Sequence, residues 1–284
     1  MPNILLTGAT GFIGSNILNS IELNNKVFVT QRLKSKTKIK KSKNIKILKF
    51  KDFKSLSNKL KKIKVDTIIH CATHYKKKHS YKDISQFAES NIMLGNILLE
   101  NIKILNAKQF INFSTTWEDI DNKKNNPKNL YAAYKKSFNC IIQYYKKKIP
   151  AVNFIDLMIV DTFGKNDKRK KLINTLRKNY NQNKITKIIS KKLYINLINV
   201  EDIVTAVKII LNNKIQPGKY ILKNTNYLNI FNLIEHINKS NSNKIKVKWL
   251  SNSLIKDKIL KYKKLKYWNP KKSNIQNIKN LILN

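Results

Sequence analysis

Tyr131 and Lys135, four residues apart in the run YAAYK, form a pair that could carry out proton transfer. Residues with this spacing share one face of a helix, so the phenol and the ammonium would lie side by side. A phenol has a pKa of about 10, and a lysine cation one turn away favours the phenolate. The pair could therefore act as a general acid or base. Because Tyr-x-x-x-Lys is common by chance in so lysine-rich a chain, its meaning depends on partners elsewhere.

A strand end that carries hydroxyl groups lies upstream of this pair. The segment FINFSTTW predicts a buried strand that ends in Ser114, Thr115 and Thr116. Open α/β sheets bind their ligands at the carboxyl ends of the strands. A hydroxyl at this place can hydrogen-bond a carbonyl or an alcohol of a substrate.

A glycine-rich turn near the N-terminus predicts a phosphate-binding loop. Gly8, Gly11 and Gly14 stand in TGATGFIG, which follows an apolar strand and opens an amphipathic helix. The first glycine permits a tight turn, the second lets a pyrophosphate approach the backbone, and the third lets the helix pack on the strand. The helix N-terminus adds free N–H groups and a positive dipole end. This strand–turn–helix context predicts a dinucleotide cofactor.

The end of the second predicted strand indicates which dinucleotide binds. NAD-specific sites usually place an acidic residue there, where it bonds the ribose 2′-hydroxyl. This strand ends in Val-Thr-Gln-Arg without an acid, and Arg32 suits the 2′-phosphate of NADP(H). We therefore expect NADP(H) to be favoured, with NAD(H) possible.

An alternation of strands and helices must hold these motifs in place. Strands are expected at 3–7, 26–30, 46–50, 66–71, 109–114 and 153–160, and helices at 55–62, 86–101 and 130–147. This α/β pattern predicts a Rossmann-type, doubly wound parallel sheet with helices on both faces. We assign residues 1–162 to this dinucleotide-binding domain and expect 193–213 to return to it. Residues 163–284 are expected to form a smaller C-terminal substrate-binding cap.

The composition narrows the class of protein. Hydrophobic residues make up 42% of the 284 residues, which is enough for a packed core. Two cysteines indicate a reducing compartment without a disulfide framework, and no Cys/His cluster typical of zinc is visible. We find neither a signal peptide nor an apolar run of the roughly 20 residues that cross a bilayer. We therefore expect a cytoplasmic protein with no metal and no membrane partner.

The charge of the chain is unusual. Lysine and arginine number 58 against 16 acidic residues, a net charge of +42, which suits a binder of nucleic acid or of anionic membranes. However, the lysines are scattered along the chain, and arginine, the usual bidentate ligand of phosphates and bases, is rare. Compositional drift is the favoured explanation. Any nucleic-acid binding should then be weak, non-specific and sensitive to salt.

In combination, these motifs resemble the extended short-chain dehydrogenases/reductases of the NAD-dependent epimerase/dehydratase type. The resemblance covers about residues 3–210 and rests on TGATGFIG, the strand end HCAT, Asn91 in NIMLGNILLE, FSTT and YAAYK, in the family's order. It implies that Tyr131 is the acid/base and that Lys135 lowers its pKa and holds the nicotinamide ribose. Thr115 would be the hydroxyl partner, with Thr116 as its rival beside the substrate.

The same resemblance implies the residues that hold the cofactor. They would be Gly8, Gly11, Phe12, Ile13 and Gly14 at the pyrophosphate, Asp52 at the adenine, and Ala72 and Thr73 along the cofactor, together with Arg32, Tyr131 and Lys135. Asn91 would be a structural or cofactor-side polar residue. One departure stands out: many relatives carry Val-Tyr-Gly after the hydroxyl, whereas this chain has Trp-Glu-Asp at 117–119.

A narrower resemblance, carried by FINFSTTW, PKNLYAAYK and DTFGKNDKRKKL, is to nucleotide-sugar ketoreductases and epimerases. It implies hydride transfer to or from a nucleotide-linked 4-keto or deoxy sugar, a homodimer, and Arg169 as a ligand of the substrate diphosphate. The expected NADP(H) favours a reductase, and an NAD-dependent 4-epimerase is the alternative. A polyanion-binding or redox-sensing protein on the same fold is a further alternative, which the intact Thr115, Tyr131 and Lys135 disfavour.

Overall fold

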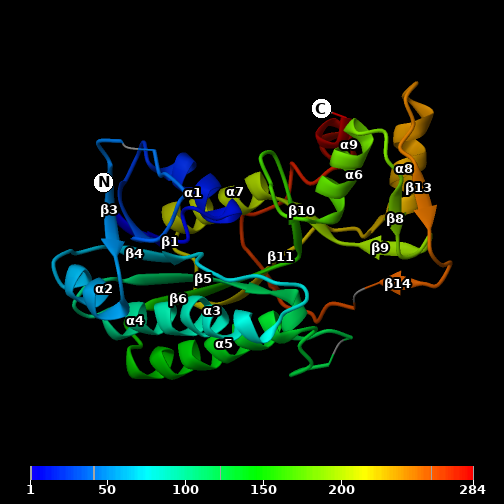
Figure 1. Cartoon of the computed structure of the whole chain (residues 1–284). Coiled ribbons are helices and arrows are strands. Elements are labelled where there is room, and N and C mark those ends of the chain that lie inside the picture. Colours follow the sequence, from blue (N-terminus) through cyan, green and yellow to red (C-terminus); the bar gives the residue numbers. More distant parts are fainter. Residues whose placement is uncertain (1, 41, 122, 257, 284) are drawn as a thin grey trace.

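Eight parallel strands form the central sheet in a computed structural model that describes residues 2–40, 42–121, 123–256 and 258–283 (Figure 1). Their order across the sheet is β15-β11-β6-β5-β4-β1-β2-β3. The bounds are β1 (Asn3–Thr7), β2 (Lys26–Arg32), β3 (Ile45–Phe50), β4 (Thr67–His70), β5 (Gln109–Thr115), β6 (Asn153–Ile159), β11 (Gly218–Leu222) and β15 (Lys263–Lys264). The order 3-2-1-4-5-6 within this sheet is that of a dinucleotide-binding fold, and it reverses direction between β1 and β4. The expected Rossmann-type sheet is confirmed.

Helices cover both faces of the sheet because alternate strand residues are apolar on both sides. On one face, Ile4 and Leu6 of β1 pack with α1 (Phe12–Ile21) and α7 (Val200–Asn212). On the other face, Leu5 packs with α2 (Phe53–Leu60), α4 (Leu94–Glu100) and α5 (Leu130–Lys148). Figure 1 shows the two groups of helices on opposite sides of the sheet.

The helix expected at 86–101 is divided into two by a π-helical turn. It consists of α3 (Ile84–Ala88), the π-turn at Glu89–Met93, and α4. Such turns often mark functional sites. The buried Asn91 lies in this one, where its Oδ1 accepts from His74 N at 2.7 Å and from Thr73 Oγ1 at 3.0 Å. The π-turn thereby fixes the loop that follows β4.

A second, smaller group of elements follows β6 and has its own apolar core. It contains α6 (Leu172–Asn181), β8 (Thr186–Ile188), β9 (Leu193–Ile195), β12 (Leu228–Asn229), α8 (Ile230–Lys239), β13 (Val247–Trp249), β14 (Ile255–Lys256) and α9 (Ile275–Leu283). These elements lie together on the right in Figure 1. Within the described ranges, no helix has the length and apolar character that crossing a membrane requires.

The chain after residue 162 divides differently from the expectation. Residues 193–213 were expected to return to the first domain, and their first part forms β9 and β10 (Leu197–Asn199). Neither strand joins the main sheet, since β9 pairs with β12 and β14, and β10 pairs with β7 (Asp161–Phe163). The helix α7, which follows β10, packs on the main sheet as expected. The strand that joins the main sheet after it is β11, whose residues 218–222 pair with β6. The sequence predicts that this segment belongs to the cap, because residues 217–284 have the pattern of short elements among loops rich in lysine and asparagine. The assignment of 163–284 to substrate binding stays a prediction.

Candidate active site

A cavity of about 460 Å³ opens at the carboxyl ends of the central strands and brings most of the predicted site residues together. The predicted residues that line it are Gly8, Gly11, Phe12, Ile13, Gly14, Arg32, Ala72, Thr73, Thr115, Tyr131, Lys135 and Arg169. Among the described lining residues, Asp52 and Thr116 are missing. Asp52 instead caps α2, where its carboxylate accepts from Ser55 N at 2.7 Å. Thr115 and Thr116 are both buried, and Thr115 is the one of the two that lines the cavity.

The glycine loop forms a cradle that a side chain would fill. Gly8 has a φ of +74°, and a Cβ placed there would lie 2.5 Å from Ala72 N. A Cβ on Gly14 would lie 2.2 Å from the carbonyl oxygen of Gly8. Both contacts show close backbone packing, which brings the loop and the start of α1 at Phe12 to the wall of the cavity, where free N–H groups can face an anionic group. These residues fit the pyrophosphate of a dinucleotide.

Arg32 lies at the end of β2 and lines the cavity, in the place where a ribose 2′-phosphate is expected. Its guanidinium pairs with Glu89 of the π-turn at 2.6 Å, and both side chains are 40% exposed. The ion pair is accessible enough for Arg32 to exchange Glu89 for another anion. Glu89 was not among the residues predicted for the site, since it stands 57 positions from Arg32.

Tyr131 and Lys135 lie in the first turns of α5, which begins where Asn129 Oδ1 accepts from Ala132 N at 3.0 Å. Both line the cavity. Loss of hydration raises the pKa of Tyr131 above its ordinary value, and the charge of Glu118 raises it further. The hydrogen bond to Thr73 and the charge of Arg169 act in the opposite direction. The balance keeps Tyr131 a protonated phenol, a state suited to donating a proton.

Lys135 is buried, and two carboxylates compensate for its burial. Lys135 is only 3% exposed, and the loss of hydration lowers the pKa of its ammonium group. Negative charge on Glu118 and on Asp156 raises the pKa again. These two acids therefore favour the ammonium form of Lys135 inside the protein.

Thr115 ends β5 with its Oγ1 accepting from Trp117 N at 3.3 Å. A hydroxyl that accepts in this way can still donate its own hydrogen. Thr115 can therefore hydrogen-bond a carbonyl oxygen placed between it and Tyr131. This arrangement supports the expected role of its hydroxyl.

An aromatic and cationic wall, which the sequence did not reveal, stands beside Tyr131. The ring of Tyr75 meets that of Tyr131 edge-on at 5.0 Å. The Nζ of Lys171 lies 4.6 Å from the centre of the Tyr75 ring and 4.8 Å from that of Trp117, and it pairs with Asp161 at 2.7 Å. All of these residues line the cavity. Of the residues in this wall, Trp117 alone stood out in the sequence, because it departs from the pattern of the family that the chain resembles.

Arg169 reaches the cavity from the loop after β7. Its Nη2 donates to Asp167 Oδ2 at 2.8 Å and to Thr162 Oγ1 at 2.7 Å. The guanidinium also lies 4.3 Å from the centre of the Phe12 ring, on the cofactor loop. Arg169 is therefore held in place beside the glycine loop, where the chain passes from β7 to α6.

Burial shifts the pKa of two neighbouring residues, His70 and Cys71. His70 is 1% exposed, its Nδ1 lies 2.8 Å from Thr7 Oγ1, and burial lowers its pKa to about 3. The imidazole is therefore neutral, as expected for a packed core residue. Cys71 lines the cavity, and burial raises the pKa of its thiol above the ordinary value, which favours the protonated thiol.

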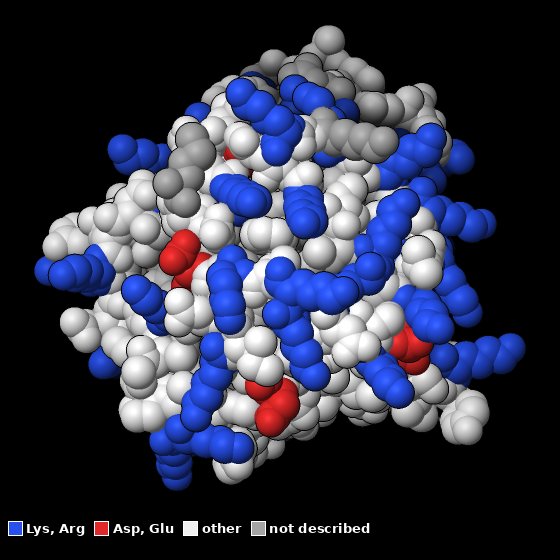
Figure 2. Space-filling view, turned by 90° about the vertical axis from the view of Figure 1, so that its left-hand side faces the viewer, with Lys and Arg blue, Asp and Glu red and all other residues white. Residues whose placement is uncertain are grey.

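Positive charge is spread over the face of the molecule that Figure 2 shows. Figure 2 views the side of the molecule that carries β3 and α2 and shows lysine and arginine side chains over the whole face, with few acidic ones between them. This dispersed distribution agrees with compositional drift better than with a single binding stripe. It still attracts anionic cofactors and substrates towards the protein.

Comparisons with known proteins agree with this geometry. The model of the "NAD dependent epimerase/dehydratase family" matches residues 4–222. CDP-abequose synthase of Yersinia pseudotuberculosis is 26% identical over 236 residues, which are 82% of this chain and 80% of that protein.

Solved structures show the same fold over nearly the whole length. A UDP-glucose 4-epimerase of Thermotoga maritima with UDP-glucose superimposes with a TM-score of 0.77, at 19% identity over 99% of this chain and 97% of the other. A dTDP-glucose 4,6-dehydratase of Bacillus anthracis in complex with NAD gives a TM-score of 0.78, at 18% identity over 99% and 96%.

Proposed function

Because the chain belongs to the NAD dependent epimerase/dehydratase family, we propose that it is an enzyme that uses NADP(H) to reduce a keto group of a nucleotide-linked sugar. One observation carries the proposal: the hydroxyl of Thr115 and the side chains of Tyr131 and Lys135 line the same cavity as the glycine loop. Relatives named as nucleotide-sugar synthases, epimerases and dehydratases support the substrate class.

The residues of this chain would divide the chemistry among them. The nicotinamide, when bound, supplies the hydride. Tyr131 donates its phenolic proton to the oxygen of the keto group, and Thr115 orients that oxygen by a hydrogen bond. Lys135 remains an ammonium and favours the phenolate that the donation leaves behind.

A reductase and an epimerase can use these same groups, and a stoichiometric assay separates them. We would mix the protein with NADPH and CDP-, dTDP-, UDP- or GDP-linked sugars, 4-keto sugars included, and follow the absorbance of NADPH. A reductase oxidises one NADPH per sugar reduced, whereas a 4-epimerase interconverts two sugars with no net change in the cofactor. Interconversion without NADPH consumption would favour the epimerase. A homodimer, and weak binding of nucleic acid, remain predictions.

Arg32→Ala is expected to remove most of the preference for NADPH over NADH. In the wild type, a bidentate contact with the 2′-phosphate should make NADPH bind several-fold tighter, since charge-assisted hydrogen bonds contribute about 1.5–3 kcal/mol. Both dissociation constants are measured by fluorescence titration at moderate ionic strength, because salt screens this contact. Equal affinities for the two cofactors in the wild type would refute the assignment of Arg32.

Two further variants sharpen this test. Lys26→Ala removes an exposed positive charge at the opposite end of β2 and should leave the NADPH to NADH ratio unchanged. Glu89→Gln releases Arg32 from its ion pair and should increase the preference for NADPH. A ratio that falls in Glu89→Gln would show that the ion pair orients Arg32 instead of competing with the phosphate.

Arg169→Ala is expected to raise the KM for the nucleotide sugar by about tenfold or more, through the loss of a charge-assisted contact with the diphosphate. Steady-state kinetics at saturating cofactor measure this effect, and titration of NADPH checks that cofactor binding survives. Lys170→Ala is the matched control, since Lys170 is an exposed neighbour outside the cavity lining. An unchanged KM in Arg169→Ala would exclude Arg169 as a substrate ligand.

A further inference from the structure

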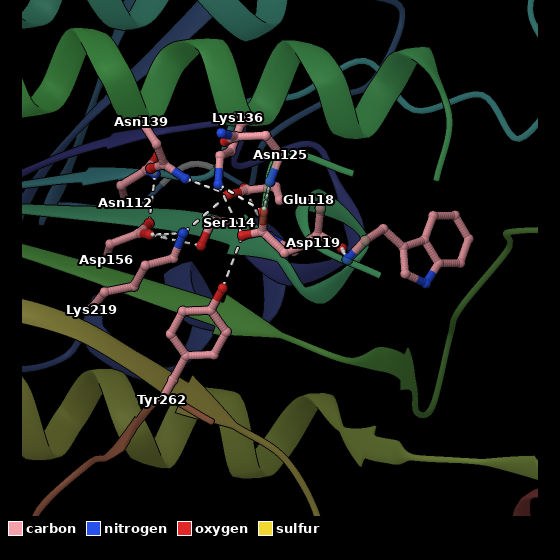
Figure 3. Close-up of polar contacts among 12 residues, drawn as sticks. Asn112, Ser114, Glu118, Asp119, Asn125, Lys136, Asn139, Asp156, Lys219 and Tyr262 are labelled. Atoms are coloured by element: carbon pink, nitrogen blue, oxygen red, sulfur yellow. Dashed lines mark hydrogen bonds and ion pairs between the residues drawn. The ribbon is translucent and has the colours of Figure 1, made fainter. Parts of the chain in front are cut away.

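Glu118 is a fully buried carboxylate directly behind the proposed catalytic groups. It is 0% exposed and ends the 3-10 turn Thr116–Glu118 that follows β5. Its Oε1 accepts from Thr115 N at 3.3 Å, and its Oε2 accepts from Asn139 Nδ2 at 2.7 Å and from Lys219 Nζ at 3.0 Å (Figure 3). Burial raises the pKa of the Glu118 carboxyl above its ordinary value, and the nearby charge of Asp156 raises it further, whereas the ammonium of Lys219 acts in the opposite direction. Because Thr115, Asn139 and Lys219 all donate to the carboxylate, the geometry favours the ionised form.

The donors belong to the elements that must be aligned for the reaction. Thr115 carries the hydroxyl at the end of β5, and Asn139 lies one helical turn after Lys135 on α5. Lys219 belongs to β11, on the far side of β6. In Figure 3 the side chains of Glu118, Asn139 and Lys219 point toward one another from these separate elements. A single carboxylate thus connects the hydroxyl strand to the helix of Tyr131.

The charges around Glu118 balance in pairs. Lys219 Nζ lies 3.0 Å from Glu118 and 3.5 Å from Asp156, which in turn accepts from Ser114 Oγ at 2.8 Å. Lys135 is the second cation whose pKa both acids raise. Two carboxylates and two ammonium groups therefore share this buried region. Buried charges persist only when they are paired in this way.

We propose that Glu118 is a positioning residue of this enzyme, which holds the Thr115 hydroxyl in register with α5 and places a buried negative charge beside that helix through its bond to Asn139. The proposal rests on the proposed function, because it takes Thr115, Tyr131 and Lys135 as the reacting set. The capping-box pattern Thr115-x-x-Glu118 supports it, since this pattern fixes the backbone at the strand end.

The charges around Lys135 and Tyr131 predict how the pKa of each group changes when Glu118 loses its charge. Around Lys135, Glu118, Asp156 and Cys71 raise its pKa, and Lys219 lowers it. Around Tyr131, Glu118 and Tyr75 raise its pKa, and Arg169 lowers it. Removing the charge of Glu118 therefore lowers the pKa of both groups. Reduction needs a proton on Tyr131, so the fall of turnover with rising pH should begin at a lower pH.

Glu118→Gln tests this directly, because it keeps the shape and removes the charge. In the NADPH-loaded enzyme we expect kcat to fall by roughly tenfold or more, KM for NADPH to stay within about twofold, and the basic limb of the kcat profile to move down by about one pH unit. Asp119→Asn is the matched control: Asp119 is 3% exposed and bonded to Lys136 and Tyr262, and within the described ranges no hydrogen bond or ion pair joins it to a partner of Glu118. It should lower the melting temperature and leave the pH profile unchanged.

Asn139→Ala separates geometry from charge and serves if Glu118→Gln does not fold. It removes the link from Glu118 to α5 and keeps the carboxylate, so kcat should fall while the basic limb stays in place. Wild-type kcat in either variant, or the same pH profile in Glu118→Gln as in the wild type, would overturn the proposal.

Hydrogen exchange supplies a readout without substrate: the amide of Thr115 should exchange faster in Glu118→Gln and not in Asp119→Asn. If the wild type reduces no nucleotide sugar, the proposed function fails, whereas unchanged exchange at Thr115 is a failure of the positioning role alone.

Discussion

Tyr131→Phe is expected to lower the turnover number by roughly 10²–10⁴-fold, the range typical of losing a positioned acid. The variant removes one hydroxyl and keeps the ring, so the edge-on contact with Tyr75 at 5.0 Å should persist. The fold and the binding of NADPH should therefore survive. Turnover is measured under saturating NADPH on a substrate that the wild type reduces, with cofactor affinity measured in parallel.

Tyr134→Phe is the matched control in the same helix turn. Its ring stacks on Phe87 at 5.4 Å, and only Tyr131 has the four-residue spacing to Lys135. Its turnover should stay near that of the wild type. Thr115→Val should lower turnover more than Thr116→Val, since Thr115 is the one of the two that lines the cavity. If Tyr131→Phe kept near-normal turnover, the proton-donor mechanism would be wrong for this protein, although the fold would stand.

Gly14→Ala is expected to destabilise the protein and to abolish most cofactor binding, against what helix propensity alone would suggest. Alanine is better than glycine in a helix by roughly 1 kcal/mol. However, the new Cβ would lie 2.2 Å from the backbone oxygen of Gly8, and backbone cannot move aside cheaply. Such overpacking costs about 1–3 kcal/mol, so the steric effect should win. Urea unfolding measures the loss, and NADPH titration measures the damage to the cradle.

Gly218→Ala is the control for glycine replacement as such. A Cβ at Gly218 would meet its nearest neighbour, the ring of Tyr220, at the ordinary contact distance of 3.4 Å. The free energy of unfolding should therefore change by less than about 1 kcal/mol. Equal stability of Gly14→Ala and the wild type would contradict the close packing of α1 against β1.

Local sequence was sufficient for the parts of the site that depend on neighbouring residues. The glycine loop, the hydroxyl at the end of β5 and the Tyr131–Lys135 pair each lie within one turn of a strand or helix, so a short pattern determines their geometry. The alternation of apolar strands with helices also predicted the class of sheet. The carboxylate of Asp52 caps α2 through Ser55 N, and its predicted bond to the adenine stays a prediction.

Only the tertiary structure decided which distant residues meet. Glu118 and Lys219 are 101 positions apart, and they pair because β11 returns beside β6 after a long excursion through the cap. Arg32 meets Glu89 because the π-turn stands above the end of β2, and Lys171 meets Tyr75 across the cavity. Such contacts depend on the order of strands and the packing of helices, which no short pattern encodes. The sequence by itself therefore determined the fold class and predicted the reacting groups, and the tertiary structure determined the charges that surround them.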